Sequence, residues 1–162
     1  MKIGIIVHSF TGNTLAVARE IRNKLTQSGH LAEIEQIKIF GGEEPNNTQI
    51  LLENPPEVSK YDALIFGAPV RGFSISPVIS SYLKQVSSLD KKRVACFVTK
   101  QLNSYWTGGK RAINSMKELC ETKDGNIVGT GVIFWRSKTR ISEIELLAEK
   151  LCDYFKLENQ AT

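Results

Sequence analysis

Apolar runs and helical periodicities alternate along this chain. Residues 2–8 form a nearly continuous apolar run, which is typical of a β-strand covered on both faces. The next stretch predicts an amphipathic helix that ends at Gly29. Its inward face contains Val17, Ile21 and Leu25 at four-residue spacing. Residues 31–38 alternate between apolar and polar positions and predict an edge strand. The start of the chain is therefore expected to fold as strand, helix and strand.

The rest of the chain continues this alternation. Two further apolar runs predict buried strands at residues 63–66 and 94–98, and residues 127–135 predict a fifth strand that contains Gly129 and Gly131. A helix is expected after each, and the first of them begins at Ser76 with Pro77 in its first turn. The inward face of the second helix contains Ile113, Met116 and Cys120. The third helix is expected to begin with the capping box Ser142-x-x-Glu145. Alternation of strands and helices at this spacing predicts the α/β class, with a parallel sheet and right-handed crossovers.

Residues 41–60 interrupt the pattern. They contain two adjacent glycines, three prolines and two adjacent asparagines. These residue types favour turns, so we expect mostly loop here, with a short helix at residues 47–53.

The turn between the first strand and the first helix carries the clearest chemical signal. Residues 9–14 read Ser-Phe-Thr-Gly-Asn-Thr and contain no charged side chain. A turn that opens a helix presents free backbone N–H groups and the positive end of the helix dipole, so it can bind a phosphate without Lys or Arg. Neither the Gly-Lys-Ser/Thr of a nucleotide P-loop nor a Gly-x-Gly-x-x-Gly turn is present.

This segment resembles the phosphate loop of flavodoxins, Ser/Thr-x-Thr-Gly-x-Thr, at every defined position: Ser9, Phe10, Thr11, Gly12, Asn13 and Thr14. The resemblance implies that the loop binds the terminal phosphate of FMN. It also implies a flavodoxin-like doubly wound sheet of five parallel strands in the order 2-1-3-4-5, with helices on both faces; flavodoxins are the standard example of that order. We expect residues 1–162 to form one such FMN-binding domain.

Two further loops are expected to hold the flavin ring, because the ligand of such a sheet lies beyond the carboxyl ends of its strands. In position they resemble the two ring-binding loops of the family. The first loop contributes Pro69, Val70, Arg71, Gly72 and Phe73, and a backbone N–H at Gly72 is expected to reach the flavin N5. The second loop contributes Thr99, Lys100, Gln101, Tyr105, Trp106 and Gly108.

Several of these side chains have two readings. Tyr105 and Trp106 either stack on the flavin or pack on the sheet edge. Phe73 either contacts the ring or attaches the following helix to the core, and Arg71 is either a ligand or a solvated loop charge. His8, at the end of the first strand, is expected to be structural rather than a proton carrier.

Composition limits the other classes of protein. The chain has 162 residues, of which 41% are hydrophobic and 23% charged, as expected for one globular domain. The apolar runs are strand-sized, and the first strand leaves no room for a signal peptide, so we expect a cytoplasmic protein without a membrane span. The three cysteines lack CxxC spacing and are expected to be buried thiols: Cys96, Cys120 and Cys152. No metal site is expected, so redox chemistry would depend on an organic cofactor.

Charge separates this chain from typical flavodoxins, which are acidic. The net charge is +4, and residues 91–140 hold eleven Lys or Arg against three acids. This segment is either a solvated face or a site that attracts an anionic reactant or an acidic protein. No helix-turn-helix, zinc or RNA-binding motif supports a nucleic-acid partner.

Two functions follow. The first is an FMN-containing electron carrier that serves redox partner proteins. The alternative is an FMN enzyme that oxidises NAD(P)H and reduces a quinone or another small acceptor. In both, the flavin performs the redox chemistry, so no catalytic side chain is expected.

Overall fold

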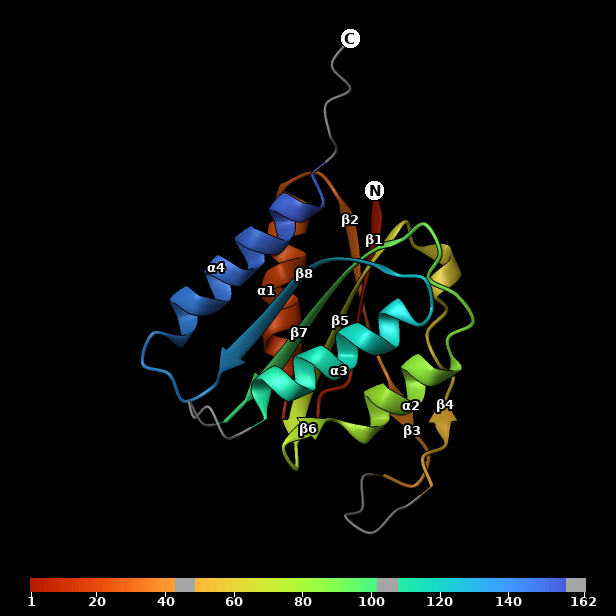
Figure 1. Ribbon diagram of the computed structural model, residues 1–162. Helices are drawn as coiled ribbons and strands as arrows, with labels where there is room; N and C mark the ends of the chain where they lie inside the picture. Colours follow the sequence, from red (N-terminus) through yellow and green to blue (C-terminus); the bar gives the residue numbers. More distant parts are fainter. Residues whose placement is uncertain (43–48, 102–107, 157–162) are drawn as a thin grey trace.

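A five-stranded parallel sheet forms the centre of the molecule. The computed structural model describes residues 1–42, 49–101 and 108–156. The strands of the sheet are β1 (Lys2–Val7), β2 (Leu31–Gln36), β5 (Ala63–Arg71), β7 (Arg93–Lys100) and β8 (Asn126–Phe134). They lie in the order β2-β1-β5-β7-β8 (Figure 1). Numbered among themselves, these strands follow the order 2-1-3-4-5, which confirms the predicted fold.

Two helices cover each face of the sheet. They are α1 (Asn13–Gln27), α2 (Pro77–Gln85), α3 (Gly109–Glu121) and α4 (Arg140–Tyr154). Helix α1 packs against α4 on one face, and α2 packs against α3 on the other (Figure 1). All four strand-to-helix connections leave the carboxyl edge of the sheet, so the predicted phosphate and ring loops share that edge.

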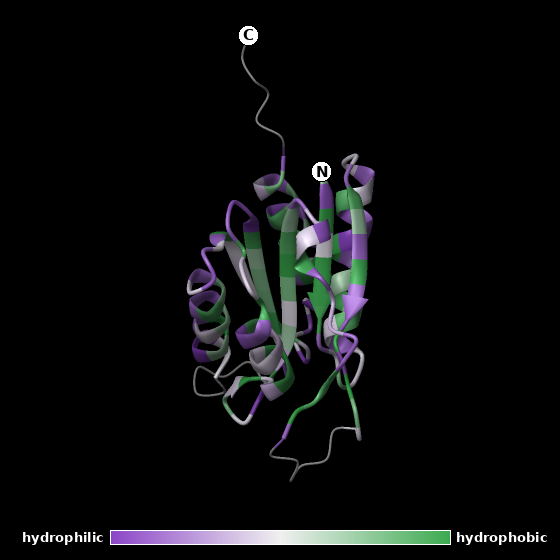
Figure 2. Cartoon of the chain, turned by 90° about the vertical axis from the view of Figure 1, so that its right-hand side faces the viewer, coloured by the Kyte–Doolittle hydropathy of each residue, from purple (hydrophilic) through white to green (hydrophobic). Residues whose placement is uncertain are grey.

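The sheet separates two apolar cores. One lies under α2 and α3 and includes Phe66, Tyr82 and Met116, and the other lies under α1 and α4 and includes Val17, Phe97 and Leu151. Figure 2 shows the apolar central strands between the more polar outer faces of the helices. The predicted inward faces of the helices are therefore confirmed, and Cys96, Cys120 and Cys152 are buried as expected.

Glycine allows one close contact within the second core. A Cβ atom at Gly67 in β5 would lie 2.2 Å from the ring of Phe97 in β7. Because β7 places the Phe97 ring directly over the Gly67 backbone, any larger residue at position 67 would displace the ring.

Several predicted boundaries were wrong. Strand β5 continues through Arg71 and forms a hairpin with β6 (Ser74–Ile75), where a loop was expected after residue 66. The expected helix at 47–53 is absent from its described part, since residues 49–51 are irregular and β4 (Leu52–Glu53) pairs with β3 (Lys38–Ile39). A short 3-10 helix, η1 (Val58–Lys60), follows.

The start of α4 also differs from the prediction. The helix begins at Arg140 with Thr139 as its N-cap residue, so Ser142 lies in the first turn and is not the cap. Ser137 Oγ accepts a hydrogen bond from the Thr139 N–H, and the Arg140 guanidinium donates to the Trp135 carbonyl oxygen. Because these contacts fix the backbone just before Arg140, α4 begins before the position that the capping box predicted.

Within the described ranges, no helix has the length and apolar character that crossing a bilayer would require.

Candidate functional site

The predicted phosphate loop joins the end of β1 to the start of α1. Gly12 is the N-cap residue, with φ of 91°, a left-handed conformation that glycine adopts without strain. Ser9 Oγ accepts the N–H of Leu15 at 3.2 Å and so holds the loop against the first helical turn. The sequence pattern and the local geometry thus agree that the chain turns sharply here and enters a helix.

This turn leaves a row of backbone donors. Among the described residues, the N–H groups of Thr11, Gly12, Asn13 and Thr14 have no hydrogen-bond acceptor. Unpaired N–H groups at a helix start, together with the helix dipole, form an anion site. The first turn of α1 carries no acidic side chain that would compete with an anion. The residues present therefore fit a phosphate group such as that of FMN.

The phosphate loop meets the ends of two central strands. A cavity of about 40 Å³ lies between them, and every residue that lines it belongs to the predicted site: Phe10, Thr11, Asn13, Thr14, Pro69, Val70, Thr99, Lys100 and Gln101. The buried hydroxyl of Thr14 in α1 lies 2.8 Å from that of Thr99 in β7. The fold thus places the phosphate loop in contact with the start of the second ring-binding loop, although the two are far apart in sequence.

His8 links the phosphate loop to the start of α2. Its ring is buried, and its Nδ1 lies 2.5 Å from Ser76 Oγ. The same Ser76 oxygen accepts the N–H of Val78 and caps α2. These contacts support the expected structural role of His8, and they add Ser76 to the residues that shape the site. The cap was predicted, but the contact between Ser76 and His8 was not.

The hairpin that joins β5 to β6 lies beside the phosphate loop. The Arg71 guanidinium lies 4.6 Å from the centre of the Phe10 ring, so a cation stacks on the phosphate loop. The turn consists of Gly72 and Phe73, with φ of 55° and 65°. Phe73 is 61% exposed, so it does not attach α2 to the core.

Gly108 brings this hairpin against the start of α3. A Cβ atom at Gly108, whose φ is 83°, would lie 2.3 Å from the carbonyl oxygen of Phe73. Gly108, expected in the second ring-binding loop, therefore lies against the backbone of the hairpin that carries the first one.

Lys100 ends β7 beneath α3. It is 7% exposed, and burial lowers the pKa of its ammonium group. Its Nζ lies 4.8 Å from the centre of the Phe134 ring, and its side chain runs along Gly109, where a Cβ atom would lie 2.9 Å from it. A buried lysine at the cavity wall places positive charge where the flavin is expected.

The two predicted stacking aromatics, Tyr105 and Trp106, lie outside the described residues. In the ranges that are described, no group of three His, Cys, Asp or Glu side chains is arranged to hold a metal ion.

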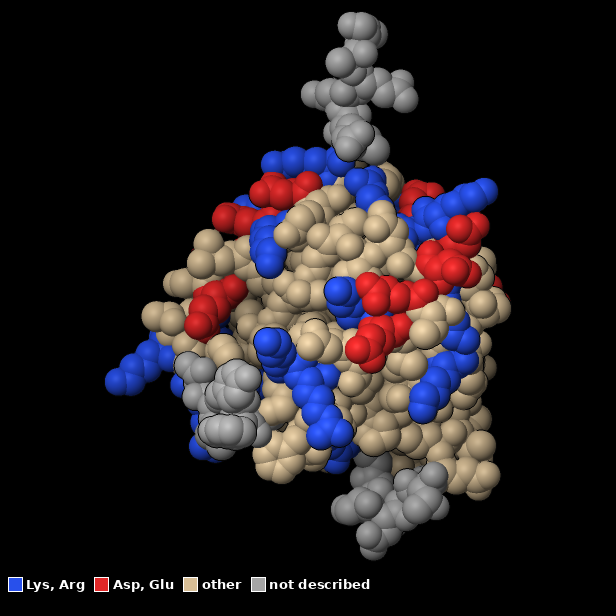
Figure 3. Space-filling model, in the orientation of Figure 1, with Lys and Arg blue, Asp and Glu red and all other residues tan. Residues whose placement is uncertain are grey.

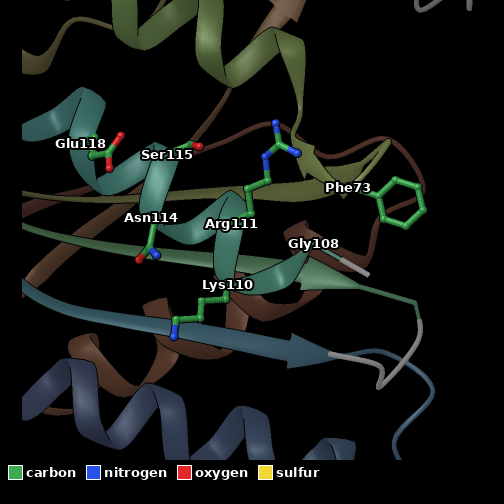
Figure 4. A pocket seen from close by; sticks show the side chains of 7 residues that line it. All are labelled: Phe73, Gly108, Lys110, Arg111, Asn114, Ser115 and Glu118. Carbon is green, nitrogen blue, oxygen red and sulfur yellow. The ribbon is translucent and has the colours of Figure 1, made fainter. Parts of the chain in front are cut away.

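A larger cavity of about 690 Å³ adjoins the hairpin and runs along α3. It is lined by Phe73, Gly108, Lys110, Arg111, Asn114, Ser115 and Glu118. Figure 4 shows Lys110 and Arg111 leaving the first turn of α3 in opposite directions, with Glu118 at the far end. The sequence placed these two cations directly after the second ring-binding loop, but it did not indicate the cavity on α3.

Comparison with known structures supports the fold. Oxidised flavodoxin 1 from Bacillus cereus superposes with a TM-score of 0.71 at 18% identity, over 96% of this chain and 100% of that one. Two-electron reduced flavodoxin from Megasphaera elsdenii gives a TM-score of 0.65 at 20% identity, over 93% of this chain and 98% of that one.

At the level of sequence, a search of curated proteins finds no match. A sequence model of the flavodoxin domain matches residues 4–128, which include most of β1, the phosphate loop and every residue that lines the 40 Å³ cavity. This chain therefore belongs to the flavodoxin domain family.

Proposed function

We propose that this protein binds FMN without a covalent bond and transfers electrons through it. The observation that carries the proposal is the row of N–H groups from Thr11 to Thr14, which has no acceptor within the described protein. Membership of the flavodoxin family and the absence of a charged side chain in the loop support the same reading.

The residues of the site divide into two groups by role. The loop from Ser9 to Thr14 would donate backbone and hydroxyl hydrogen bonds to the phosphate. The segments Pro69–Phe73 and Thr99–Gln101, with Gly108 and with Tyr105 and Trp106, would position the ring. When bound, the flavin supplies the redox chemistry, and the protein supplies binding, orientation and electrostatics.

The site favours FMN over FAD. The cradle is a single helix start that suits one terminal phosphate, and the sequence lacks a second nucleotide motif. Fluorescence titration of the cofactor-free protein with FMN, FAD and riboflavin tests this. We expect FMN to bind much more tightly than riboflavin, which lacks the phosphate. Equal affinity for FMN and riboflavin would remove the loop from the site, and tighter binding of FAD would overturn the choice of cofactor.

The second candidate is an NAD(P)H-dependent FMN enzyme. The observation that favours it is the pair Lys110 and Arg111 beside the cavity on α3, because cations attract phosphorylated or carboxylated substrates. Adding NADH or NADPH to the FMN-loaded protein without oxygen separates the two functions. Rapid bleaching of the flavin would favour the enzyme, and an unchanged spectrum would favour the carrier.

A further inference from the structure

Positive charge is concentrated at the carboxyl edge of the sheet. The strand ends, connections and first helical turns at the four strand-to-helix crossings contain one acid, Glu143, against seven cations: Arg71, Lys100, Lys110, Arg111, Arg136, Lys138 and Arg140. We call these seven residues the basic edge. In Figure 3, the lower part of the visible face shows blue side chains and no red ones among the coloured residues. Six of the eleven cations of residues 91–140 therefore lie at the edge that carries the proposed flavin site, and Arg71 joins them from β5.

Helix α3 carries its charges against its own dipole. Lys110 and Arg111 lie in its first turn, and Glu118 and Glu121 lie near its end. Acids near the start and bases near the end would stabilise a helix, so this arrangement costs stability. Residues that oppose a local stability rule often mark a functional surface. The cations and the helix dipole here add to the same positive potential beside the flavin site.

Four members of the basic edge are exposed and form no ion pair within the described ranges: Lys110, Arg111, Arg136 and Lys138. The ion pairs among described residues lie elsewhere, for example Lys24 with Glu149 and Lys60 with Glu35, and none includes Lys110 or Arg111. These charges remain available to a partner.

Two exposed aromatic rings accompany the charges. Phe10 is 57% exposed and Phe73 is 61% exposed, and each belongs to a segment that borders the proposed flavin site. Aromatic residues and arginine are enriched where protein interfaces bind most strongly. Exposed apolar rings beside cations therefore give this edge the composition of a docking surface.

The shape of the edge suits a protein better than a small molecule. Of the seven residues that line the cavity on α3, five have exposed side chains, among them Lys110 and Arg111. Small-molecule sites enclose most of the surface of their ligand, and a cavity with exposed walls does not. A protein with carboxylates around its own redox centre would instead cover the edge as a whole.

We propose that the basic edge docks an acidic redox protein, which exchanges electrons with the flavin at the Phe10 and Phe73 rim. The inference deepens the proposed function and rests on it for the electron-transfer step. Docking itself depends only on residues of this chain. The charge of the partner is thus the reverse of that expected for a typical acidic flavodoxin.

Binding measurements with probe proteins test the proposal. Two acidic carriers, a [2Fe–2S] ferredoxin and a cytochrome b5, are compared with the basic cytochrome c by calorimetry at low and at moderate salt. We expect at least one acidic carrier to bind at low salt and to lose affinity as salt rises, because screening weakens attraction between exposed charges. If both acidic carriers bind no better than cytochrome c, the proposal is overturned.

Matched variants locate the surface. The double variant Lys110→Gln/Arg111→Gln should weaken binding of the acidic carrier about tenfold, at roughly 0.7 kcal/mol for each exposed pair. The double variant Arg22→Gln/Lys84→Gln removes the same net charge from exposed positions on α1 and at the end of α2, and it should retain the affinity. Equal weakening by both variants would mean that net charge alone attracts the carrier, which would overturn the docking surface.

The failure of docking can be told apart from the failure of the proposed function. Each titration is performed with cofactor-free and with FMN-loaded protein. Carrier binding without any FMN binding would overturn the proposed function and leave the docking surface in place. FMN binding without carrier binding would overturn the docking surface and leave the proposed function in place. Displacement of the carrier by micromolar NADPH would show that the edge recognises a small anion, which would also overturn a protein partner.

Discussion

The hydroxyl groups of Thr14 and Thr99 form a buried hydrogen bond of 2.8 Å across 85 positions of sequence. Thr14 lies in the first turn of α1, and Thr99 is the residue before the last in β7. The bond ties the phosphate cradle to the strand end that leads into the second ring-binding loop. Changes at Thr14 should therefore affect both the phosphate and the geometry of the loop.

Replacing Thr14 with Asp should abolish tight FMN binding. A carboxylate about 5 Å from the phosphate, at an effective dielectric of about 20, costs about 3 kcal/mol for each unit of phosphate charge. FMN affinity should fall at least about 100-fold by fluorescence titration. Thr11→Asp is the companion variant, because Thr11 is exposed and its loss should not affect folding. Unchanged FMN affinity in both variants would show that the phosphate binds elsewhere.

Replacing Gly67 with Ala should destabilise the fold. The added methyl group would lie 2.2 Å from the Phe97 ring, and overpacking of this kind costs about 1–3 kcal/mol. Urea denaturation should show a lower free energy of unfolding. The double variant Gly67→Ala/Phe97→Leu should recover part of the loss, because leucine withdraws the clashing atoms. If the double variant loses as much free energy of unfolding as the two single variants added together, the contact between Gly67 and Phe97 does not explain the cost.

The sheet could be predicted because the signals of its five strands are local. Each central strand is a continuous apolar run, and the phosphate loop identifies the family that orders them. The end of β5 could not be predicted in this way, since Gly67 and Pro69 are usual turn signals. Strand β1 pairs with β5 only as far as Gly67. Pro69 lies beyond the last residue of β5 that pairs with β1, so its missing N–H breaks no hydrogen bond between these two strands, and β5 can continue.

Contacts between segments that are distant in sequence also could not be predicted. The pairing of His8 with Ser76, the stacking of Arg71 on Phe10 and the passage of Lys100 under Gly109 all depend on which strand ends are neighbours. Composition could identify a basic segment. The sequence also placed Lys100, Lys110 and Arg111 in or beside the second ring-binding loop, and the topology adds Arg136, Lys138 and Arg140 at the same edge.

His30 should make stability depend on pH. Its ring is buried, its Nδ1 has no hydrogen-bond partner within the described residues, and burial, with the N-terminus and Arg93 nearby, lowers its pKa from 6.5. Between the folded and unfolded pKa values the unfolded chain binds more protons, so stability falls as pH drops below about 6.5. The variant His30→Leu should lose less stability than the natural chain between pH 7.5 and 5.5 in urea denaturation. Parallel pH profiles would contradict this role.

Tyr105 and Trp106 remain the predicted cover of the flavin ring. If either ring stacks on the flavin, FMN should quench the protein fluorescence strongly, and Trp106→Ala should raise the flavin fluorescence at equal occupancy. Tyr105→Ala serves as the parallel variant, because the two residues are neighbours in one loop. No change in either variant would mean that both rings only pack against the protein.

Lys100 and Arg71 should raise the reduction potential of the bound flavin. Lys100 lines the cavity beside the phosphate loop, and Arg71 stacks on Phe10, which lines it as well. A cation about 7 Å from the flavin, at an effective dielectric of about 20, stabilises added negative charge by about 2 kcal/mol. Because about 1.4 kcal/mol corresponds to roughly 60 mV for a one-electron step, the variant Lys100→Gln/Arg71→Gln should lower the potential by several tens of millivolts or more. Redox titration with dye mediators measures the shift, and Arg22→Gln/Lys84→Gln, with the same net charge, should leave the potential almost unchanged. An equal potential in the natural chain and the first variant would show that these cations lie too far from the flavin to act on it.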